Sequence, residues 1–389
     1  MKDNKIKVGI VGLVFGGAFP TIYRDHPDVS EVVICDKNEK LLKDFSEKFH
    51  FAKCCTSYEE LLNSDVDAIH ILTNIHTHAD LAIKALRAGK HCAVTVPMAT
   101  TLEEIRNIIK EKEKSGKNYM MMETSVYTYQ CLYVKHLLDS GRLGKIQYLR
   151  GTHFQDMEGW PDYWKGLPPL HYGTHAISPL LYLSGLRAES VHCLGSGTMR
   201  RELIEHYGNP YPVETAVFRL SDGKTAADVT RSLFETAHEY VEGFSVFGDK
   251  MSFEWNFEEE DPYIYEFTDS MEKTTIGERG KKIEKRAVHC PDQAQILPES
   301  IRKYTTEYAI LDPEHPDMYM KQGGGHHGSH PHMVHEFVRS IIEEREPMID
   351  VFTAADWTAV GICGHESAMK QGEEVIIPDF RKEFSPEYT

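Results

Sequence analysis

The sequence predicts a two-domain α/β protein: a doubly wound parallel sheet, followed by an α+β domain with a large open, mostly antiparallel sheet. Strand and helix signals alternate over residues 1–120, and the first strand ends in a glycine-rich turn. From about residue 125, strand-like runs follow one another with few helices between them. The 389 residues correspond to about two domains of roughly 150 residues or more. We place these domains at residues 1–124 and 125–389.

Each unit of the first domain joins a short apolar run to an amphipathic segment, which is the pattern of βαβ units in a parallel sheet. The strands are expected at residues 5–12, 30–36, 67–73, 91–97 and 118–125. The helices are expected at residues 18–26, 38–50, 79–89 and 100–116. The last of these helices begins with a capping-box pattern, Thr101 to Glu104, and ends at Gly116.

The second domain has a different order of predicted elements, in which turns such as Ser-Asp-Gly separate successive strand-like runs. After a helix at 127–144, strands are expected at residues 145–155, 188–196, 215–223, 226–235, 240–249 and 250–257. Residues 258–325 are polar and poorly periodic, so we expect long loops over a site there. Two helices, at 330–347 and 353–372, and a short strand at 374–378 end the chain.

Composition excludes several classes of function. The net charge of −17 argues against a nucleic-acid partner and against binding to an anionic membrane surface. No apolar run approaches the ~18 residues of a membrane span, and the chain enters a strand too early for a secretory leader. Eight scattered cysteines form no CxxC pair, so we expect reduced thiols and a cytoplasmic protein.

The first strand runs into a dinucleotide fingerprint, G-x-G-x-x-G, in which Val14 replaces the middle glycine. Gly12 allows the tight turn from strand to helix, and Gly17 allows the helix and the strand to pack closely. We expect Gly16 to take part of the role of the missing glycine, beside a helix N-terminus whose N–H groups favour phosphates.

Asp36 ends the second strand about 20 residues after the fingerprint, where an acidic residue is expected to bind the adenosine ribose. A carboxylate at this position repels a 2′-phosphate, so the sequence favours NAD over NADP. The alternative is a glycine-rich turn in an α/β domain that binds no nucleotide.

Four segments in fixed order resemble the Gfo/Idh/MocA family of oxidoreductases: GIVGLVFGGAF, LTNIHTHADLAIKALRAGKHCAVTVPMA, SGRLGKIQYLRG and the terminal FVRSIIEEREP…TAADWTAVGICGHESAMKQGEEVIIP. The resemblance implies a Rossmann domain that binds NAD and a second domain whose sheet forms substrate pockets. That sheet often forms oligomer interfaces too, so we expect a homo-oligomer, a dimer or a tetramer. By this resemblance the cofactor-binding residues are Gly12, Val14, Phe15, Gly16, Gly17, Asp36, Thr73, Asn74, His76, His78, Val96 and Pro97.

Two departures from the family pattern are informative. The usual Glu-Lys-Pro is Thr95-Val96-Pro97, so the lysine that polarises the reacting hydroxyl is absent. The usual Asp-x-x-x-His runs from His171 to His175. Both departures resemble the NAD-dependent α-N-acetylgalactosaminidases and related redox-neutral glycosidases, as do a methionine-rich strand before Glu123, a Tyr-x-Thr-His-x-x-x-Pro segment and a glycine–histidine loop.

Without the lysine, His175 is the expected base for the departing hydroxyl proton, since an imidazole titrates near neutral pH. Tyr172 is its expected partner, with His171 as a neighbouring cation that favours the phenolate. Glu123 ends the fifth strand at the expected ligand crevice and serves as an acid, a base or a ligand of a sugar hydroxyl. The alternatives are a buried structural role for His175, and a surface or salt-bridge role for Glu123.

We expect a carbohydrate substrate, bound in part by His153, Trp164, His326 and His327. Transient oxidation at C3 makes the C2 proton acidic, the C1 substituent leaves, water adds, and the hydride returns. The alternatives are a simple sugar or polyol dehydrogenase with net NADH production, and a non-catalytic NAD-binding regulator. No metal is expected, because the histidine-rich segment 323–332 matches no closed zinc motif; a metal site on its imidazoles is the alternative.

Overall fold

The structure is a computed structural model that describes residues 5–257, 260–306, 309–310, 319–320 and 325–385. The chain divides into two compact units, each discontinuous in sequence. The first unit comprises Met1–Tyr129, Asp292–Thr358 and Phe380–Thr389, and the second comprises Gln130–Pro291 and Ala359–Asp379. This division differs from the single boundary expected after residue 124.

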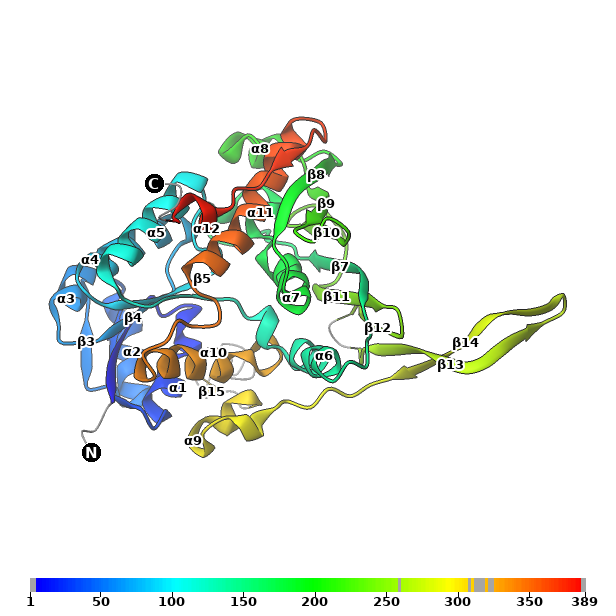
Figure 1. Cartoon of the computed structure of the whole chain (residues 1–389). Coiled ribbons are helices and arrows are strands. Elements are labelled where there is room, and N and C mark those ends of the chain that lie inside the picture. The colour runs from blue at the N-terminus through cyan, green and yellow to red at the C-terminus, as the bar shows by residue number, and fades with distance from the viewer. Residues whose placement is uncertain (1–4, 258–259, 307–308, 311–318, 321–324, 386–389) are drawn as a thin grey trace. The chain divides into compact units, whose positions relative to one another are not determined.

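The first unit holds a parallel six-stranded sheet in the order β3-β2-β1-β4-β5-β6, which confirms the doubly wound arrangement (Figure 1). Its strands are β1 Ile6–Val11, β2 Val29–Cys35, β3 Lys53–Cys55, β4 Ala68–Ile71, β5 His91–Thr95 and β6 Tyr119–Met122. The strand order reverses between β1 and β4. In sheets of this kind ligands bind outside the carboxyl ends of the strands at the point of reversal.

Helices connect these strands. They are α1 Pro20–Asp25, α2 Glu39–Phe49, α3 Tyr58–Asn63, α4 His78–Arg87 and α5 Leu102–Ser115, with short 3₁₀ turns η1 Gly16–Ala18, η2 Ile75–Thr77 and η3 Ser125–Tyr127. The predicted capping box at α5 is confirmed, because Thr101 and Glu104 each accept the other's backbone N–H at 3.1 Å. The helix ends, as predicted, at Gly116 in a left-handed conformation.

Side-chain contacts explain why a late segment belongs to the first unit. Helix α10, Gly325–Ile342, packs on α1 and η3, and α9, Glu299–Arg302, packs on α1. Tyr304 donates to the Asp25 carboxylate at 2.7 Å, and Arg339 donates to Asp28 at 2.8 Å. The other late elements of this unit are η6 Ala294–Ile296, η7 Lys303–Thr305, β15 Ala309–Ile310, β16 Tyr319–Met320 and α12 Phe380–Glu383.

The second unit is built on a nine-stranded sheet in the order β14-β13-β12-β11-β7-β10-β9-β8-β17. All neighbours are antiparallel except β7 and β10, so the predicted, mostly antiparallel sheet is confirmed. The strands are β7 Ile146–Phe154, β8 Ala188–Ser196, β9 Val213–Leu220, β10 Ala226–Ser232, β11 Val241–Gly248, β12 Met251–Trp255, β13 Tyr263–Thr274, β14 Gly277–Ala287 and β17 Val375–Ile376. The helical segments are α6 Tyr129–Asp139, η4 Asp162–Trp164, η5 Pro169–Tyr172, α7 Thr174–Ser184, α8 Arg201–Tyr207 and α11 Val351–Met369, which begins in the first unit.

Helix α7 covers one face of this sheet, where it packs on β7, β10 and β11. Gly151 of β7 permits this contact, because a Cβ at that position would lie 2.1 Å from the Ala176 carbonyl oxygen of α7. The buried residues include Leu149, Gly151 and His153 on β7 and Ala227, Val229 and Arg231 on β10, and the residues between them are half-buried or exposed. The residues that α7 carries are therefore held directly over the sheet.

Residues 263–287 correct the expectation of long loops between 258 and 325. They form a long antiparallel hairpin, β13 and β14, which extends beyond the other strands of its sheet (Figure 1). Charged side chains stand on both faces of β14, and all of that strand is exposed. A strand without a buried face has no alternation of apolar and polar residues, so this hairpin has no period-two signal in the sequence.

Among the described residues, no helix combines the length and the apolar character that a membrane span requires. The eight cysteines are all free thiols.

Candidate functional site

The turn after β1 has the backbone that the dinucleotide fingerprint requires. Gly12 has a φ of +92°, and a Cβ there would lie 2.5 Å from the Leu72 carbonyl oxygen. Gly16 packs against the Leu72 side chain, and a Cβ at Gly16 would lie 2.9 Å from the Leu72 Cβ. Both glycines therefore let the turn lie close to the end of β4. Val14 and Phe15, at its crest, are 78% and 48% exposed, so the turn presents an apolar surface beside its backbone N–H groups.

Asp36 ties the end of β2 to this turn. One carboxylate oxygen accepts the Leu13 N–H at 2.8 Å, and the other accepts the Asn38 N–H at 2.8 Å. The half-buried carboxylate thus lies at the carboxyl edge of the sheet beside the fingerprint. This placement fits the ribose-binding role expected from the sequence, and the two backbone contacts hold the carboxylate in one orientation.

The residues expected after β4 form a connected turn. The hydroxyls of Thr73 and Thr77 lie 2.7 Å apart, and the Asn74 side chain accepts the His76 N–H at 3.0 Å. His78 is fully buried, with Nδ1 2.8 Å from the Pro97 carbonyl oxygen.

The Nε2 atom of His78 lies 3.1 Å from the Thr73 carbonyl oxygen, and burial lowers the pKa of this imidazole. His78 therefore ties the segment after β4 to the segment after β5. Val96, the residue at the position of the family's lysine, is buried. Cofactor binding by these residues stays a prediction.

The histidine-rich segment of α10 lies against the fingerprint turn within the first unit. The ring of Phe15 is 6.1 Å from that of His326 and 6.2 Å from that of His330. His327 lies 6.3 Å from the Tyr129 ring. His326 and His327 have left-handed backbone conformations. The structure therefore brings His326, one of the two histidines that we expected to bind substrate, to the turn expected to bind the cofactor, whereas His327 lies against Tyr129.

Glu123 follows β6 at the carboxyl edge of the same sheet. Its side chain is fully buried, and one carboxylate oxygen accepts the Ser125 N–H at 3.0 Å. This burial excludes the surface alternative for Glu123. Its catalytic role stays a prediction.

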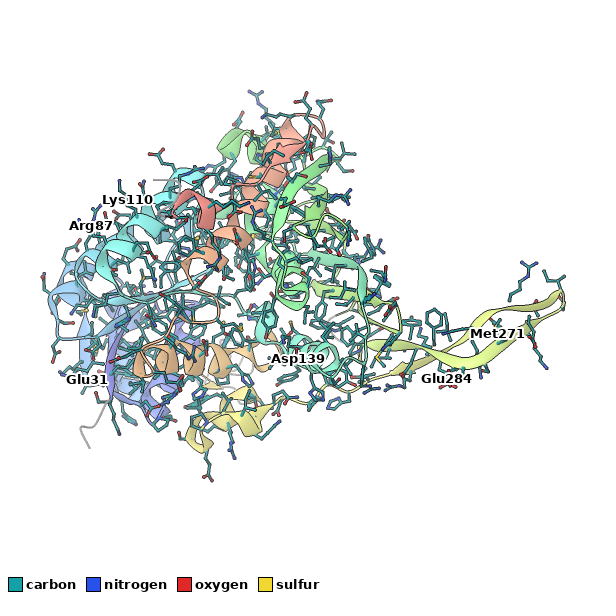
Figure 2. The ribbon with its side chains drawn as sticks, in the orientation of Figure 1. Glu31, Arg87, Lys110, Asp139, Met271 and Glu284 are labelled. Carbon is teal, nitrogen blue, oxygen red and sulfur yellow. The ribbon has the colours of Figure 1, made fainter. Side chains whose placement is uncertain are left out.

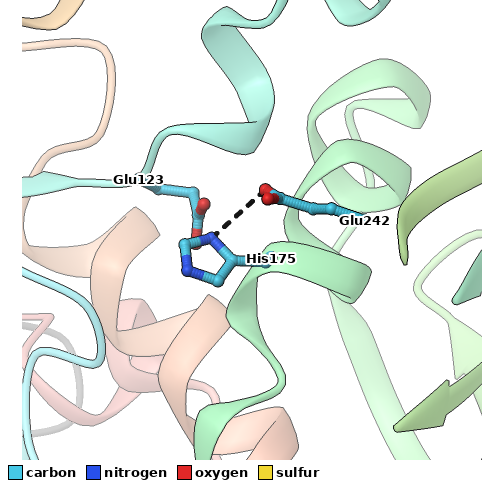
Figure 3. Close-up of side chains that lie close together, drawn as sticks. All are labelled: Glu123, His175 and Glu242. Atoms are coloured by element: carbon cyan, nitrogen blue, oxygen red, sulfur yellow. Dashed lines mark ion pairs between the residues drawn. The ribbon is translucent and has the colours of Figure 1, made fainter. Parts of the chain in front are cut away.

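The second unit gathers a buried acid–base cluster around His175 on α7. Nε2 of His175 lies 3.3 Å from the Tyr172 hydroxyl. Its Nδ1 lies 3.5 Å from a carboxylate oxygen of Glu242 on β11 (Figure 3). His175 is 4% exposed, Glu242 is also buried, and Tyr172 is half-buried. Glu123, drawn in the same figure, belongs to the first unit.

Two further side chains complete this cluster. The ring of His153, on β7, lies 5.5 Å from His175 and 5.3 Å from Tyr240. The Tyr240 hydroxyl donates to the second carboxylate oxygen of Glu242 at 2.9 Å. His153 is fully buried, so its sequence-predicted contact with substrate stays a prediction, whereas its contact with the acid–base cluster is part of the structure.

Arg231, at the end of β10, is the cation beside Tyr172. Its guanidinium lies 5.5 Å from the centre of the Tyr172 ring, and its Nε donates to the Tyr172 carbonyl oxygen at 3.0 Å. It also donates to the carbonyl oxygens of His153 and Ser232 and to the Gln155 side chain. Arg231 is fully buried, and this burial lowers the pKa of its guanidinium to about 10.

His171, which we expected to be that cation, lies beside a different group. Its ring is 5.0 Å from that of His365 on α11. Nδ1 of His365 lies 2.6 Å from a carboxylate oxygen of the buried Glu214, whose other oxygen accepts the Leu170 N–H at 2.8 Å. Glu214 and His365 therefore hold the η5 turn that carries Tyr172.

Trp164 is buried and packs edge-on against Tyr172, with 4.8 Å between the ring centres. Trp160 packs against Trp164 at 6.0 Å and is 47% exposed. The structure thus places Trp164 behind Tyr172, and its contact with a sugar stays a prediction.

Glu242, Arg231 and Glu214 were missed from the sequence. Each lies inside a strand, on the face covered by α7 or α11, at a position where the period-two pattern predicts an apolar side chain. A charged residue at a core-facing position was the available signal, because a buried charge requires partners.

Comparison with known proteins decides the family. Residues 6–123 match the NAD-binding Rossmann fold of the Gfo/Idh/MocA oxidoreductase family, and residues 131–254 match the C-terminal domain of the same family. The chain belongs to the Gfo/Idh/MocA family. Its identity as an NAD-binding oxidoreductase, expected from the sequence, is thereby confirmed. Residues 293–384 match the C-terminal domain of glycosyl hydrolase family 109.

Relatives of this Gfo/Idh/MocA protein carry the glycosyl hydrolase name. A glycosyl hydrolase family 109 protein of Porphyromonas gingivalis is 23% identical over 98% of the chain and 86% of its own length. A family 109 protein of Bacteroides fragilis is 25% identical with the same two coverages. The chain therefore resembles the glycosidase-like subgroup that its sequence motifs indicated.

Solved structures show the same fold. A levoglucosan dehydrogenase in complex with NADH and levoglucosan has a TM-score of 0.75 at 19% identity, covering 96% of this chain and 100% of its own. An NAD-binding oxidoreductase from Klebsiella pneumoniae has a TM-score of 0.76 at 17% identity, covering 96% and 99%. The Gfo/Idh/MocA fold that the sequence predicted is confirmed.

Proposed function

We propose that this protein cleaves a glycoside by a redox-neutral, NAD-dependent route, in which the sugar is transiently oxidised at C3. One observation carries the proposal: the buried imidazole of His175 has a phenol on one nitrogen and a carboxylate on the other, while the family's lysine position holds Val96. Proton transfer therefore depends on this cluster. The similarity to glycosyl hydrolase family 109 supports the same reaction class.

NAD, when bound, would supply the redox chemistry, which is reversible hydride transfer with the sugar carbon. In the first unit, the glycine turn and Asp36 would hold the cofactor. The close backbone approach that Gly12 permits would suit the phosphates, and the Asp36 carboxylate would accept hydrogen bonds from the ribose hydroxyls.

Tyr172 and His175 move the proton of the C3 hydroxyl. Tyr172 is more exposed than His175, so its hydroxyl receives the substrate proton and His175 stores it. Glu242 favours the tautomer with a proton on Nδ1, which leaves Nε2 to accept from the phenol. The carboxylate also stabilises the imidazolium that results, as a carboxylate behind a catalytic histidine does.

Elimination then requires a base for the C2 proton and an acid for the departing C1 oxygen. We assign the base to Glu123, a buried carboxylate at the ligand-binding edge of the parallel sheet. Water then adds to C1 and gives its proton to the group that protonated the departing oxygen, while the proton held by Glu123 returns to C2. The proton stored on His175 returns to the C3 oxygen when C3 is reduced again. No net oxidation of the sugar results, and one water is consumed.

The test uses purified protein with NAD and a panel of aryl glycosides, including N-acetylhexosaminides, in D₂O. We expect release of the aglycone without accumulation of reduced nicotinamide, and deuterium at C2 of the released sugar. Reduced nicotinamide that accumulates in proportion to substrate contradicts the proposal and indicates a simple dehydrogenase. Binding of NAD without turnover of any glycoside, sugar or polyol indicates a regulatory protein.

A further inference from the structure

Two thiols of the first unit lie side by side at the carboxyl edge of its parallel sheet. Cys35 ends β2, Cys55 ends β3, and the two residues are register partners. Register partners on parallel strands point to the same face of the sheet. Both side chains are buried, with exposures of 1% and 7%, and the two thiols hydrogen-bond to each other. A third thiol, that of Cys54, pairs in register with Ile34 and is exposed.

The two strands hold these thiols at a spacing that a disulfide can bridge. Neighbouring strands lie about 4.8 Å apart, and disulfides join residues whose Cα atoms are about 4.4–6.8 Å apart. An ion pair also fixes the register, because Lys53 at the start of β3 donates to the Glu31 carboxylate of β2 at 2.8 Å (Glu31 is labelled in Figure 2). The Cys35 and Cys55 thiols can therefore be joined without a rearrangement of the sheet.

The two thiols differ in reactivity. Burial raises the pKa of both, so oxidation is slow at neutral pH. At Cys55, however, hydrogen bonds from the Cys35 thiol and from the Ser57 backbone N–H favour the thiolate, which is the reacting form of a cysteine. Cys55 is also the more exposed of the two and lies on β3, the edge strand of the sheet. Cys55 is therefore the expected nucleophile, and Cys35 is the resolving thiol.

The backbone of the thiol pair belongs to the predicted cofactor site. The Gly12 N–H donates to the Cys35 carbonyl oxygen at 2.9 Å, and the Asp36 N–H donates to the Cys55 carbonyl oxygen at 3.3 Å. The Asp36 carboxylate in turn accepts the Leu13 N–H of the fingerprint turn. A shift at the ends of β2 and β3 therefore moves the carboxylate that we expect to bind the ribose.

We propose that Cys35 and Cys55 form an oxidative modification site, at which a hydroperoxide converts the two thiols to a disulfide that weakens NAD binding. The loss of affinity rests on the ribose-binding role expected of Asp36, whereas formation of the disulfide does not. The proposal goes beyond the glycosidase reaction, since it uses none of the acid–base groups of the second unit.

The oxidation balances in two steps. The Cys55 thiolate attacks one oxygen of the hydroperoxide, so that an S–O bond forms, the O–O bond breaks, and hydroxide leaves and takes up the thiol proton as water. The sulfur of Cys35 then attacks that of Cys55, so that the S–S bond forms, the S–O bond breaks, and a second water leaves with the proton of Cys35. The two thiols lose two electrons and two protons, and hydrogen peroxide is reduced to two waters.

The disulfide changes the spacing of the two strand ends. It holds the Cβ atoms about 3.8 Å apart, which is less than the strand spacing of about 4.8 Å. The ends of β2 and β3 are therefore drawn together, and Asp36, which follows Cys35 directly, moves with them. A displacement of this size breaks or lengthens hydrogen bonds to the ribose hydroxyls.

The test treats the reduced full chain with hydrogen peroxide and follows two readouts. Peptide mapping by mass spectrometry, without a reducing step, is expected to find the peptides of Cys35 and Cys55 joined by a disulfide. Isothermal titration is expected to show NAD affinity about tenfold weaker, as the loss of a hydrogen bond to a charged group produces. Dithiothreitol is expected to restore the affinity.

Cysteine variants identify the thiols responsible. Reduced Cys35→Ala and Cys55→Ala are expected to bind NAD as the wild type does and to keep their affinity after peroxide. Cys54→Ala is the matched control, since Cys54 is adjacent in sequence but exposed and outside the pair, and it is expected to respond as the wild type does. The peptide map of the wild type needs no variant, so it remains decisive if an alanine variant fails to fold.

Three results overturn the proposal. They are Cys35 and Cys55 that remain free thiols after peroxide, a loss of affinity that persists in Cys55→Ala, and a disulfide that leaves NAD affinity unchanged. In the last case the reduced variant Asp36→Ala locates the error. Unchanged NAD affinity in Asp36→Ala refutes the ribose-binding role of Asp36, whereas weakened affinity shows that the disulfide does not displace the carboxylate.

Discussion

Arg231 fixes both the backbone and the ring of Tyr172: Nε donates to the carbonyl oxygen at 3.0 Å, and the guanidinium lies 5.5 Å from the ring centre. The same guanidinium holds the carbonyl oxygens of His153 and Ser232. One buried cation therefore joins the η5 turn to the ends of β7 and β10. The position of Tyr172 relative to His175 therefore depends on these hydrogen bonds of Arg231.

Replacing Arg231 is expected to misplace Tyr172. Arg231→Met removes four hydrogen bonds, two of them fully buried, and a displacement of about 1 Å in a catalytic group costs on the order of 10²-fold in rate. We expect kcat to fall by about that factor while affinity for NAD is unchanged. Steady-state kinetics and NAD titration measure both. Arg231→Lys keeps the positive charge but loses the planar guanidinium with its several N–H donors, so it recovers only part of the rate. A full rate in Arg231→Met contradicts the assignment.

Glu242 is expected to act through His175. Glu242→Gln keeps an acceptor for the Tyr240 hydroxyl but loses the charge beside Nδ1, so the imidazolium is less stable. We expect kcat to fall by on the order of 10²–10⁴-fold. The acidic limb of the pH–rate profile should shift to lower pH. Glu254→Gln on the neighbouring strand β12 is the matched control and leaves the profile unchanged. Equal profiles for the two variants refute the role of Glu242.

His171 and His175 are expected to differ strongly, although the sequence suggested catalysis for both. His171 lies beside His365, whereas His175 contacts Tyr172 directly. We expect His171→Asn to lower kcat by less than about tenfold and His175→Asn by on the order of 10²–10⁴-fold. Parallel measurements of aglycone release and thermal unfolding separate the effects. Comparable losses in the two variants restore His171 to the proton-transfer pathway.

The sequence predicted most of the first unit, because its helices are amphipathic and its strands are bounded by caps and glycines. Helix α7 gave no such signal, since nearly all its side chains are buried and Pro179 lies inside it. Periodicity requires one exposed face. The β13–β14 hairpin could not be predicted from periodicity for the opposite reason, because β14 is exposed on both faces.

Part of the candidate site was likewise predictable from the sequence and part was not. His175 and Tyr172 lie close together in sequence, so one motif contained both. Glu242 and Arg231 reach the cluster from separate strands, β11 and β10, and only the register of the sheet brings them there. No pattern within a short stretch of the sequence indicates that these residues contact one another. The late segment that joins the first unit was unpredictable for the same reason, because its contacts are long-range.

Gly12 is expected to be irreplaceable for cofactor binding. Its φ of +92° is unfavourable for an L side chain, and a Cβ would lie 2.5 Å from the Leu72 carbonyl oxygen. We expect Gly12→Ala to weaken NAD binding at least tenfold and to destabilise the protein by a few kcal/mol. Isothermal titration with NAD measures the affinity. Gly89→Ala is the control, since Gly89 also has a positive φ but open space around it. Unchanged affinity in Gly12→Ala places the dinucleotide elsewhere.

Acid is expected to destabilise the first unit through its buried histidines. His330 is buried against Phe19, and burial lowers the pKa of its imidazole to about 3. Since the pKa in the unfolded chain is about 6.5, the unfolded state binds more protons below that pH, and stability falls as the pH decreases from about 6.5 towards 3. At pH 5 the loss from one such group is about 2 kcal/mol.

His330→Phe removes this titration and keeps a ring of similar shape beside Phe19. We therefore expect the variant to gain about 2 kcal/mol over the wild type at pH 5 relative to pH 8. Urea unfolding at the two pH values, without cofactor, measures the difference. His289→Phe is the control, because His289 is largely exposed. If His330→Phe shows the same pH dependence as the wild type, His330 is not the buried neutral group that the structure places beneath the fingerprint turn.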